Sequence, residues 1–487
     1  MRWRVAGTAA AIAITLSLTA ACADMGTATT VSSERAAEST TASTSTAAAS
    51  TGASTTARTS GASTTASPPQ TTIAKTATLP SDALAIASAA ITDVQAFWSG
   101  AMQQVYGKAY TPLAGGSVAA TSNARLPACG THQLTYRDVQ NNALYCPEND
   151  FVLYDTGLIR DLNTDYGSNV VATVIAHEFG HAIQNRAGVS APTIIMELQA
   201  DCFAGAWAAF ANRTPSSPFQ FGSQQLNATI GGFLEFRDEV GVGAQDAGAH
   251  GNAFDRVGAF QDGFEAGASR CSQYVRTPPT ITEIPFTNAV DQANGGNLPY
   301  ADIITLTLAD LDRFWKDTFA KENKTYTTIK TLKPYNANEK VTCGTSTLTT
   351  DFLKSNAFYC SADDTLAWDD QRLETEVYDS IGDFAVSLIL SNAWADAIQT
   401  REKSTLQGRA RSLQQHCYSG AWVGSILRNS AVNQQLSLSP GDLDEGITSL
   451  LSYGDVRKLG NAQIGTAFER VAAFRKGLQQ GVASCRS

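Results

Sequence analysis

The sequence predicts a helix-dominated α+β fold that is duplicated in tandem. Eight of the nine cysteines form two sets of four, and each cysteine of the first set recurs 214 or 215 positions later: 129 and 343, 146 and 360, 202 and 417, 271 and 485. A spacing that holds over the length of a domain indicates an internal repeat. In each copy the expected helices outnumber short strand-like runs such as residues 151–154, which favours helices with a small sheet.

The N-terminus has the features of an exported lipoprotein. Arg2 and Arg4 precede an apolar run that is too short for a membrane span, which predicts a signal peptide over residues 1–21. Small residues lead up to Cys22, so we expect Cys22 to carry a lipid that anchors the protein to the membrane outside the cytoplasm. The alternative is ordinary cleavage near Ala21 and full secretion.

The remaining chain divides by composition. Residues 22–79 are mostly Ser, Thr, Ala and Gly, which bury too little apolar surface to order a chain, so a disordered tether is predicted. Two domains, residues 80–275 and 299–487, follow on either side of a Pro- and Gly-containing linker, residues 276–298. The formal net charge of -10, without a basic block, argues against a nucleic-acid partner.

Cysteines of exported proteins commonly form disulfides, and cysteines that are neighbours along the sequence are the simplest disulfide partners to expect. This reasoning predicts four disulfides, Cys129–Cys146, Cys202–Cys271, Cys343–Cys360 and Cys417–Cys485. Tryptophans recur in the same register and are expected in the core: Trp98 with Trp315, and Trp207 with Trp422.

The order of elements can be predicted for the first copy. We expect a helix around Phe97, a strand over residues 151–154, a helix from an N-cap at Ser168 to Gly188, a helix that Ser190 and Pro192 begin, and a last helix over residues 252–270.

The third of these elements, the helix after Ser168, carries a metal motif. His177 and His181 are four residues apart, so both imidazoles can reach one metal ion from one helix face. Glu178 lies between them and can take a proton from a water at the metal, which is the general-base role in a zinc hydrolase.

A third ligand is expected downstream. A catalytic zinc needs three protein ligands and an open position, and Glu197 in the next helix supplies the third. Asp201 lies one helical turn after Glu197 and can accept the spare ring N–H of a ligand histidine, which would fix that ring.

These segments resemble a bacterial family, the putative neutral zinc metallopeptidases. The resemblance rests on HEFGHAIQ (177–184), ELQADCFAGAW (197–207), His250-Gly251 and Arg256, with Ala128-Cys129-Gly130 and Leu144 to Pro147 upstream, and covers about residues 95–271. It implies a zincin-like metallopeptidase fold. Ala182 departs from the family pattern, which often has another histidine there, but that position is not a needed ligand.

The second copy has lost this chemistry. Asn392, Ala393 and Asp396 stand where the first copy has His177, Glu178 and His181, while Ser412, His416 and Ile464 stand where it has Glu197, Asp201 and His250. We therefore expect one Zn²⁺ per chain and a non-catalytic second copy, in which His416 is structural or lies at the surface.

These observations predict a lipid-anchored extracytoplasmic zinc metallopeptidase that hydrolyses peptides or proteins. Glu178 would be the base, and His250 would stabilise the oxyanion if it is not simply an exposed turn residue. Two alternatives stay open: a cell-envelope binding or scaffold lipoprotein with a vestigial metal, and a zinc amidohydrolase acting on cell-wall peptides. The sequence does not give the substrate or the oligomeric state.

Overall fold

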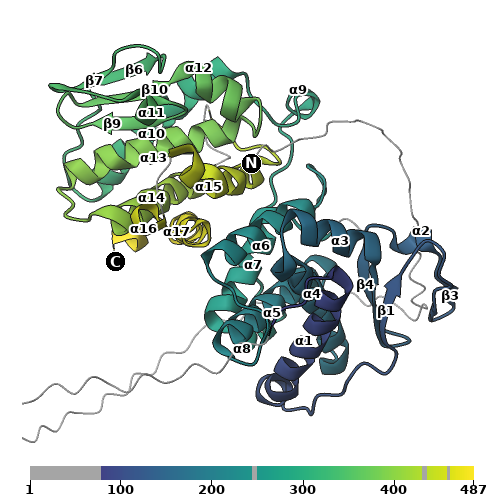
Figure 1. Cartoon of the computed structure of the whole chain (residues 1–487). Helices are drawn as coiled ribbons and strands as arrows, with labels where there is room; N and C mark the ends of the chain where they lie inside the picture. Colours follow the sequence, from purple (N-terminus) through teal and green to yellow (C-terminus); the bar gives the residue numbers. More distant parts are fainter. Residues whose placement is uncertain (1–77, 244–248, 430–435, 458–460, 487) are drawn as a thin grey trace, which may run out of the picture. The chain divides into compact units, whose positions relative to one another are not determined.

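The computed structural model describes residues 78–243, 249–429, 436–457 and 461–486 (Figure 1). The predicted signal peptide, the lipid site at Cys22 and nearly all of the predicted tether lie outside these residues. The described part is dominated by helices with small sheets, as the sequence predicts.

The first copy contains eight helices and five strands in its described residues. In chain order they are α1 (Ala83–Tyr106), β1 (Gly116–Ala120), β2 (Ala128–Cys129), β3 (His132–Gln133), α2 (Tyr136–Val139), β4 (Ala143–Cys146), β5 (Phe151–Asp155), α3 (Thr156–Asp165), α4 (Ser168–Ala187), α5 (Thr193–Arg213), α6 (Ser223–Glu235), α7 (Ala253–Ala266) and α8 (Ala268–Ser272).

The second copy follows the short linker helix α9 (Ala289–Ala293) and repeats the order of strands and long helices. Its described elements are α10 (Tyr300–Lys321), β6 (Thr331–Tyr335), β7 (Thr342–Cys343), β8 (Ser346–Thr347), α11 (Thr350–Leu353), β9 (Ala357–Cys360), β10 (Thr365–Asp369), α12 (Asp370–Arg372), the π-helical turn η1 (Leu373–Tyr378), α13 (Asp383–Arg401), α14 (Gly408–Asn429), α15 (Asp442–Arg457), α16 (Asn461–Ile464), α17 (Ala467–Gln480) and the 3₁₀ turn η2 (Val482–Arg486).

The sheets repeat in order and direction. The first sheet has the order β1-β5-β4, with β1 parallel to β5 from the pair Gly116 and Phe151 onward, and β4 antiparallel to β5. The second has the order β6-β10-β9 with the same directions, beginning with the pair Thr331 and Thr365. A two-stranded hairpin, β2-β3 or β7-β8, precedes the antiparallel strand in each copy.

All four predicted disulfides are present in the structure. The predicted core tryptophans are fully buried, and one from each copy makes the same hydrogen bond. The indole N–H of Trp207 donates to Asp93 at 2.9 Å, and that of Trp422 donates to Asp310 at 2.8 Å. The recurring cysteines and tryptophans therefore hold the scaffold.

The helix that carries the histidine motif, α4, is buried along most of its length. Its predicted end at Gly188 is confirmed, because that glycine has φ 71° in the left-handed region that closes a helix. Its predicted N-cap is wrong by one residue. Gly167 precedes the helix, and Ser168 is its first residue, whose hydroxyl donates to Asn163 instead of capping the helix.

The next helix, α5, is long and apolar enough to cross a membrane, but 89% of that stretch is buried in the protein. The burial of α5 gives its apolar composition a packing role. The predicted last helix breaks at Gly267 into α7 and α8.

Helices α5 and α7 pack backbone against backbone. A Cβ at Gly263 would lie 1.8 Å from the carbonyl oxygen of Cys202, and one at Gly205 would lie 2.0 Å from that of Phe260. The second copy repeats both contacts at Gly477 and Gly420. This contact, with the Cys202–Cys271 disulfide, fixes α5 and hence Glu197.

We therefore expect Gly263→Ala to destabilise the protein by about 3 kcal/mol or more, the upper end for overpacking, because rigid backbone must move. Gly100→Ala is the matched control, since a Cβ there meets nothing within 4 Å and alanine favours a helix by up to about 1 kcal/mol. Chemical denaturation of both variants measures the difference. Equal stability of the two variants would contradict the close contact.

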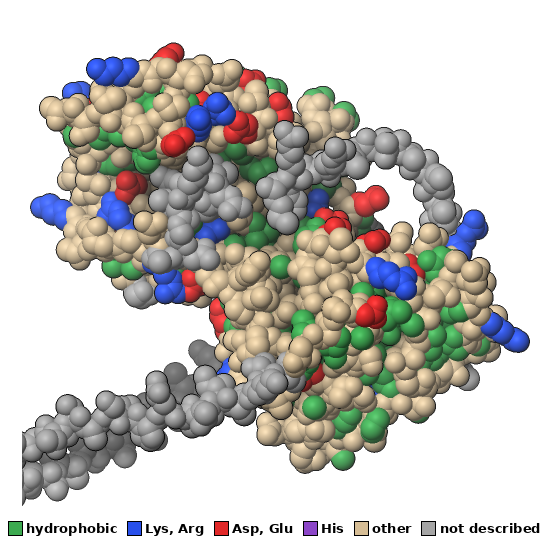
Figure 2. Space-filling view, in the orientation of Figure 1, with side chains coloured by type: hydrophobic (Ala, Val, Ile, Leu, Met, Phe, Trp, Pro, Cys, Tyr) green, Lys and Arg blue, Asp and Glu red, His purple; other side chains and the backbone are tan. Residues whose placement is uncertain are grey.

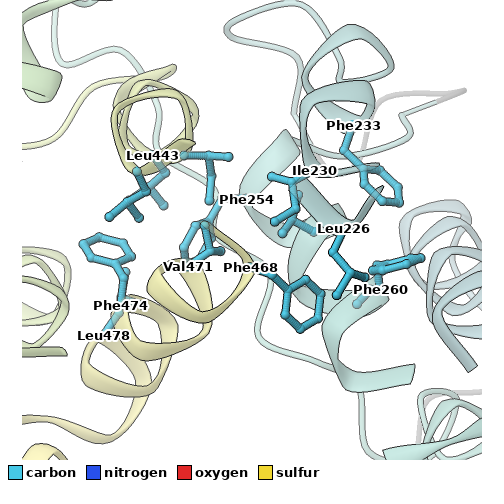
Figure 3. Close-up of a cluster of buried hydrophobic side chains, with 14 of the residues drawn as sticks. Leu226, Ile230, Phe233, Phe254, Phe260, Leu443, Phe468, Val471, Phe474 and Leu478 are labelled. Atoms are coloured by element: carbon cyan, nitrogen blue, oxygen red, sulfur yellow. The ribbon is translucent and has the colours of Figure 1, made fainter. Parts of the chain in front are cut away.

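The two copies contact each other through apolar side chains of α6 and α7 on one side and α15 and α17 on the other (Figure 3). Polar bonds border this cluster. The backbone N–H of Phe254 donates to Asp444 at 3.1 Å, and the side-chain amide of Gln261 donates to the carbonyl of Phe468 at 2.9 Å. On the face drawn in Figure 2, Lys and Arg side chains are scattered rather than gathered into a patch.

Candidate metal centre

A cavity of about 600 Å³ opens beside α4. The described residues that line it all belong to the first copy and include both motif histidines, Glu178, Glu197, Asp201 and His250. Every residue that the sequence assigned to the site therefore borders one space.

Three of these residues converge on one point. The Nε2 atoms of His177 and His181 are 3.1 Å apart, and Glu197 on α5 places one carboxylate oxygen 3.2 Å from the first and the other 3.4 Å from the second. One atom from each of the three residues lies within 4.8 Å of the others. The helical spacing on α4 and the antiparallel approach of α5 produce this triangle.

Asp201 orients His177. Its Oδ1 lies 2.7 Å from Nδ1 of His177, and its two oxygens also accept bonds from Nε and Nη2 of Arg256, at 2.8 and 3.0 Å. Asp201 is completely buried, and burial would raise its pKa, but Arg256 and His177 lower it below the ordinary value. An ionised carboxylate only accepts, so Nδ1 of His177 must donate to it, and Nε2 is the nitrogen that would carry the lone pair of the neutral ring.

Gln184 orients His181 in the same way. The side-chain N–H of Gln184 donates to the carbonyl of Met196 at 2.6 Å, so its Oε1 is the atom 2.9 Å from Nδ1 of His181. Nδ1 of His181 therefore donates to Gln184, and its Nε2 would carry the lone pair of the neutral ring.

The two Nε2 atoms and the carboxylate of Glu197 thus face one another across about 3 Å. Oε2 of Glu197 is buried and accepts no hydrogen bond from the described residues. Two imidazoles and a carboxylate with the remaining ring nitrogens fixed are the donors of a three-ligand catalytic zinc site. These residues fit Zn²⁺, and without a metal ion a proton on His177, whose pKa the two neighbouring carboxylates raise, can supply the positive charge instead.

The electrostatics of the site favour a positive charge. Burial would lower the pKa of His177, but Asp201 and Glu197 raise it to about 10. Burial would raise the pKa of Glu197, but His177 and His181 hold it well below its usual range. The pKa of Glu178 is raised by burial and lowered less by the two histidines. Glu178 is buried at 7% exposure and borders the cavity beside the three converging groups.

His250 lies at the rim of the cavity, three residues before the start of α7. Its side chain is 55% exposed, and Nδ1 is 3.4 Å from Oδ1 of Asp238. Asp238 also accepts the backbone N–H groups of His250 and Gly251, at 2.8 and 2.6 Å. The residue is therefore held near the site but is not among the three converging groups.

The second copy replaces the metal triangle with an ion pair. Arg411 donates from Nε to Asp396 at 3.0 Å, and Gln415 donates to the same oxygen at 3.0 Å. Asn392 and His416 lie 2.9 Å apart, the counterpart of the contact between His177 and Asp201. No candidate metal group in the described residues includes these side chains. His416 is buried, which bears out its structural interpretation.

Two supporting residues were not predicted from the sequence. Gln184 and Arg256 recur in the second copy as Gln399 and Arg470, so a comparison of the copies does not mark them as site residues. Gln399 makes the scaffold bond of Gln184 again, to the carbonyl of Arg411 at 3.0 Å. The other end of Gln184 differs between the copies, because its Oε1 lies 2.9 Å from Nδ1 of His181 in the first copy.

Comparison with known proteins decides the family. The sequence model of the family described as "Putative neutral zinc metallopeptidase" matches residues 1–274 and 286–401. The chain belongs to this family. The two matched stretches are consistent with the internal repeat.

The curated relatives that the chain matches are uncharacterized proteins. The chain is 36% identical over 83 residues to the uncharacterized protein Rv2575 of Mycobacterium tuberculosis, covering 14% of the chain and 28% of that protein. It is 28% identical over 152 residues to the uncharacterized protein YpfJ of Escherichia coli, covering 27% of the chain and 53% of that protein. The chain thus spans about half or less of these relatives. No solved structure matches it, so the zincin-like fold stays a prediction.

Proposed function

We propose that the protein is a zinc-dependent peptidase with one catalytic centre, at His177, His181 and Glu197 of the first copy. The observation that carries this proposal is the convergence of the two Nε2 atoms, 3.1 Å apart, with the carboxylate of Glu197, while the other nitrogen of each ring is held by a hydrogen bond.

In this proposal the chain's residues divide the work. When bound, Zn²⁺ would polarise the scissile carbonyl and acidify water. Glu178 accepts the proton of the attacking water and returns it to the leaving amine, and its raised pKa suits a base that works near neutrality. Asp201 and Gln184 keep the ligand rings in place, and Arg256 holds Asp201.

The cellular setting is proposed from the sequence. A lipid at Cys22 would anchor the protein outside the cytoplasm, and the Ser- and Thr-rich tether would let the catalytic copy reach peptide or protein substrates. The second copy would stabilise the first through the apolar contact between α6, α7, α15 and α17 (Figure 3). It lines no described part of the cavity.

Peptide hydrolysis tests this function. Zinc-loaded protein is incubated with a proteome-derived peptide mixture, and new termini are identified by mass spectrometry, with and without a zinc chelator. We expect new termini that disappear with the chelator and return with added Zn²⁺. The same assay is run on cell-wall peptides. Cleavage of cell-wall peptides alone would favour an amidohydrolase, and no cleavage of either the peptide mixture or the cell-wall peptides would favour a binding protein.

His250→Ala should keep zinc and lower turnover at least tenfold, toward the loss of about 10²- to 10³-fold that is typical of an oxyanion donor. The reason is its position at the rim, from which the ring can reach a carbonyl held in the cavity. His132→Ala is the matched control, because His132 is also exposed and lies outside the cavity. Turnover is compared at equal zinc content. Unchanged turnover would show that His250 is an exposed residue without a catalytic role. Loss of zinc would show that His250 is a metal ligand.

A further inference from the structure

The second copy contains a buried group of three carboxylates that the zinc chemistry does not use. Asp383 begins α13, while Asp442 and Glu445 lie in the first turn of α15. One carboxylate oxygen from each lies within 4.8 Å of the others. Asp383 is 3% exposed and Asp442 is 5% exposed.

Each carboxylate uses one oxygen on a backbone N–H. Oδ2 of Asp383 accepts from Leu298 at 2.9 Å, Oδ2 of Asp442 from Ser439 at 2.8 Å, and Oε2 of Glu445 from Phe384 at 3.0 Å. Oδ1 of Asp383 is buried and accepts no hydrogen bond in the part of the chain that the structure describes. A buried carboxylate oxygen without a partner is costly unless a proton or a cation meets it.

The backbone is shaped to admit this group. Gly382 has φ 141°, and a Cβ at that position would lie 2.0 Å from the carboxylate carbon of Glu445. The first copy has Gly167 and Ser168 where the second has Gly382 and Asp383, so the acidic residue at the helix start belongs to the second copy alone.

Within the described residues, no ion pair reaches Asp383, Asp442 or Glu445, whereas the neighbouring Asp444 pairs with Arg237 at 3.3 Å. Asp291 of the linker helix adds a fourth negative charge nearby, with Ser439 donating to it at 2.8 Å. Burial raises the pKa of Asp383 to about 6 and, with the charge of Asp383, that of Glu445 to about 8.

We propose that Asp383, Asp442 and Glu445 form a binding site for one Ca²⁺ ion, distinct from the zinc centre. An all-oxygen, multiply anionic site suits a hard cation, whereas zinc in proteins prefers nitrogen and sulfur. Ligand oxygens within 4.8 Å of one another can all lie about 2.3–2.6 Å from a central Ca²⁺. The looser geometry that Ca²⁺ accepts favours it over Mg²⁺, which needs a near-ideal octahedron.

A cation here would join three segments. At the end of the linker, the backbone N–H of Leu298 donates to Asp383. At the start of α13, the backbone N–H of Phe384 donates to Glu445. In the turn before α15, the backbone N–H of Ser439 donates to Asp442. Calcium would therefore fasten the linker to the second copy and stabilise the start of α13.

The test uses the mature, zinc-loaded chain titrated with CaCl₂, followed by calorimetry and thermal unfolding. We expect one Ca²⁺ per chain and a melting temperature that rises by on the order of 5 °C when calcium exceeds its dissociation constant 100-fold. Asp442→Asn keeps an oxygen for the N–H of Ser439 but should lose both effects, and without calcium it should melt at the same or a higher temperature because a like charge is gone.

Asp379→Asn is the matched control, since Asp379 is an exposed acid four residues before Asp383, and it should bind calcium as the wild type does. Zinc content should be unchanged in both variants, which separates this test from that of the peptidase. Absence of calcium binding up to about 10 mM, above the range of extracellular calcium modules, would overturn the proposal in favour of a protonated cluster. Undiminished binding by Asp442→Asn would overturn it as well.

Discussion

Glu178→Gln is expected to abolish peptide hydrolysis while zinc stays bound. The amide has nearly the shape of the carboxylate but cannot accept the proton of the attacking water, and a general base typically contributes about 10²- to 10⁴-fold. None of the three converging groups is Glu178, so their triangle should remain. Turnover and zinc content are measured on the same preparation.

The control for this variant is Glu239→Gln, which removes an exposed carboxylate outside the cavity. It should hydrolyse peptides at the wild-type rate. A Glu178→Gln enzyme with near wild-type turnover would show that another group accepts the proton.

Glu197→Ala should lose zinc rather than turnover alone. Removing an outer partner of a metal ligand typically costs 10- to 100-fold in affinity, so removing a ligand should cost more than about 100-fold. Asp201→Ala is the comparison variant, because Asp201 contacts His177 on the side away from the triangle. Its zinc affinity should fall by only about 10- to 100-fold. Competition with a zinc-binding dye measures both affinities.

The counterpart of Glu197 in the second copy provides a further control. Ser412→Ala changes a buried residue at the equivalent position and should leave zinc affinity unchanged. If Glu197→Ala keeps full zinc affinity, the third ligand lies elsewhere and the assignment of the triangle is wrong.

The ligands were predictable because helical geometry alone places His177 and His181 on one face. Glu197 followed from the need for a third donor, and Asp201 from its spacing of one turn. The disulfides followed from sequence order and the repeat. These inferences depend on local spacing or on one chemical rule, and the structure brings all these residues together.

Long-range partners were not predictable in the same way. Gln184 reaches His181 only because its amide is fixed by Met196 on another helix, and Arg256 reaches Asp201 from α7. Both are retained in the second copy, where their scaffold bonds survive without the metal. Comparing the copies therefore separates ligands from scaffold but misses residues that serve both.

The acidic group of the second copy escaped the sequence for a related reason. Asp383 and Asp442 are 59 positions apart, as their numbers show, and neither belongs to a motif. Their proximity arises where α15 meets the start of α13, with Gly382 leaving room for Glu445. Only the folded chain brings the three carboxylates together.

Counting zinc in the purified mature chain tests the central claim most directly. Elemental analysis after dialysis against metal-free buffer should give one zinc ion per chain, because the first copy keeps three donors and the second has the ion pair of Arg411 with Asp396. A value of two would mean that the second copy also binds zinc. A value of zero after loading with Zn²⁺ would contradict the catalytic centre at His177, His181 and Glu197.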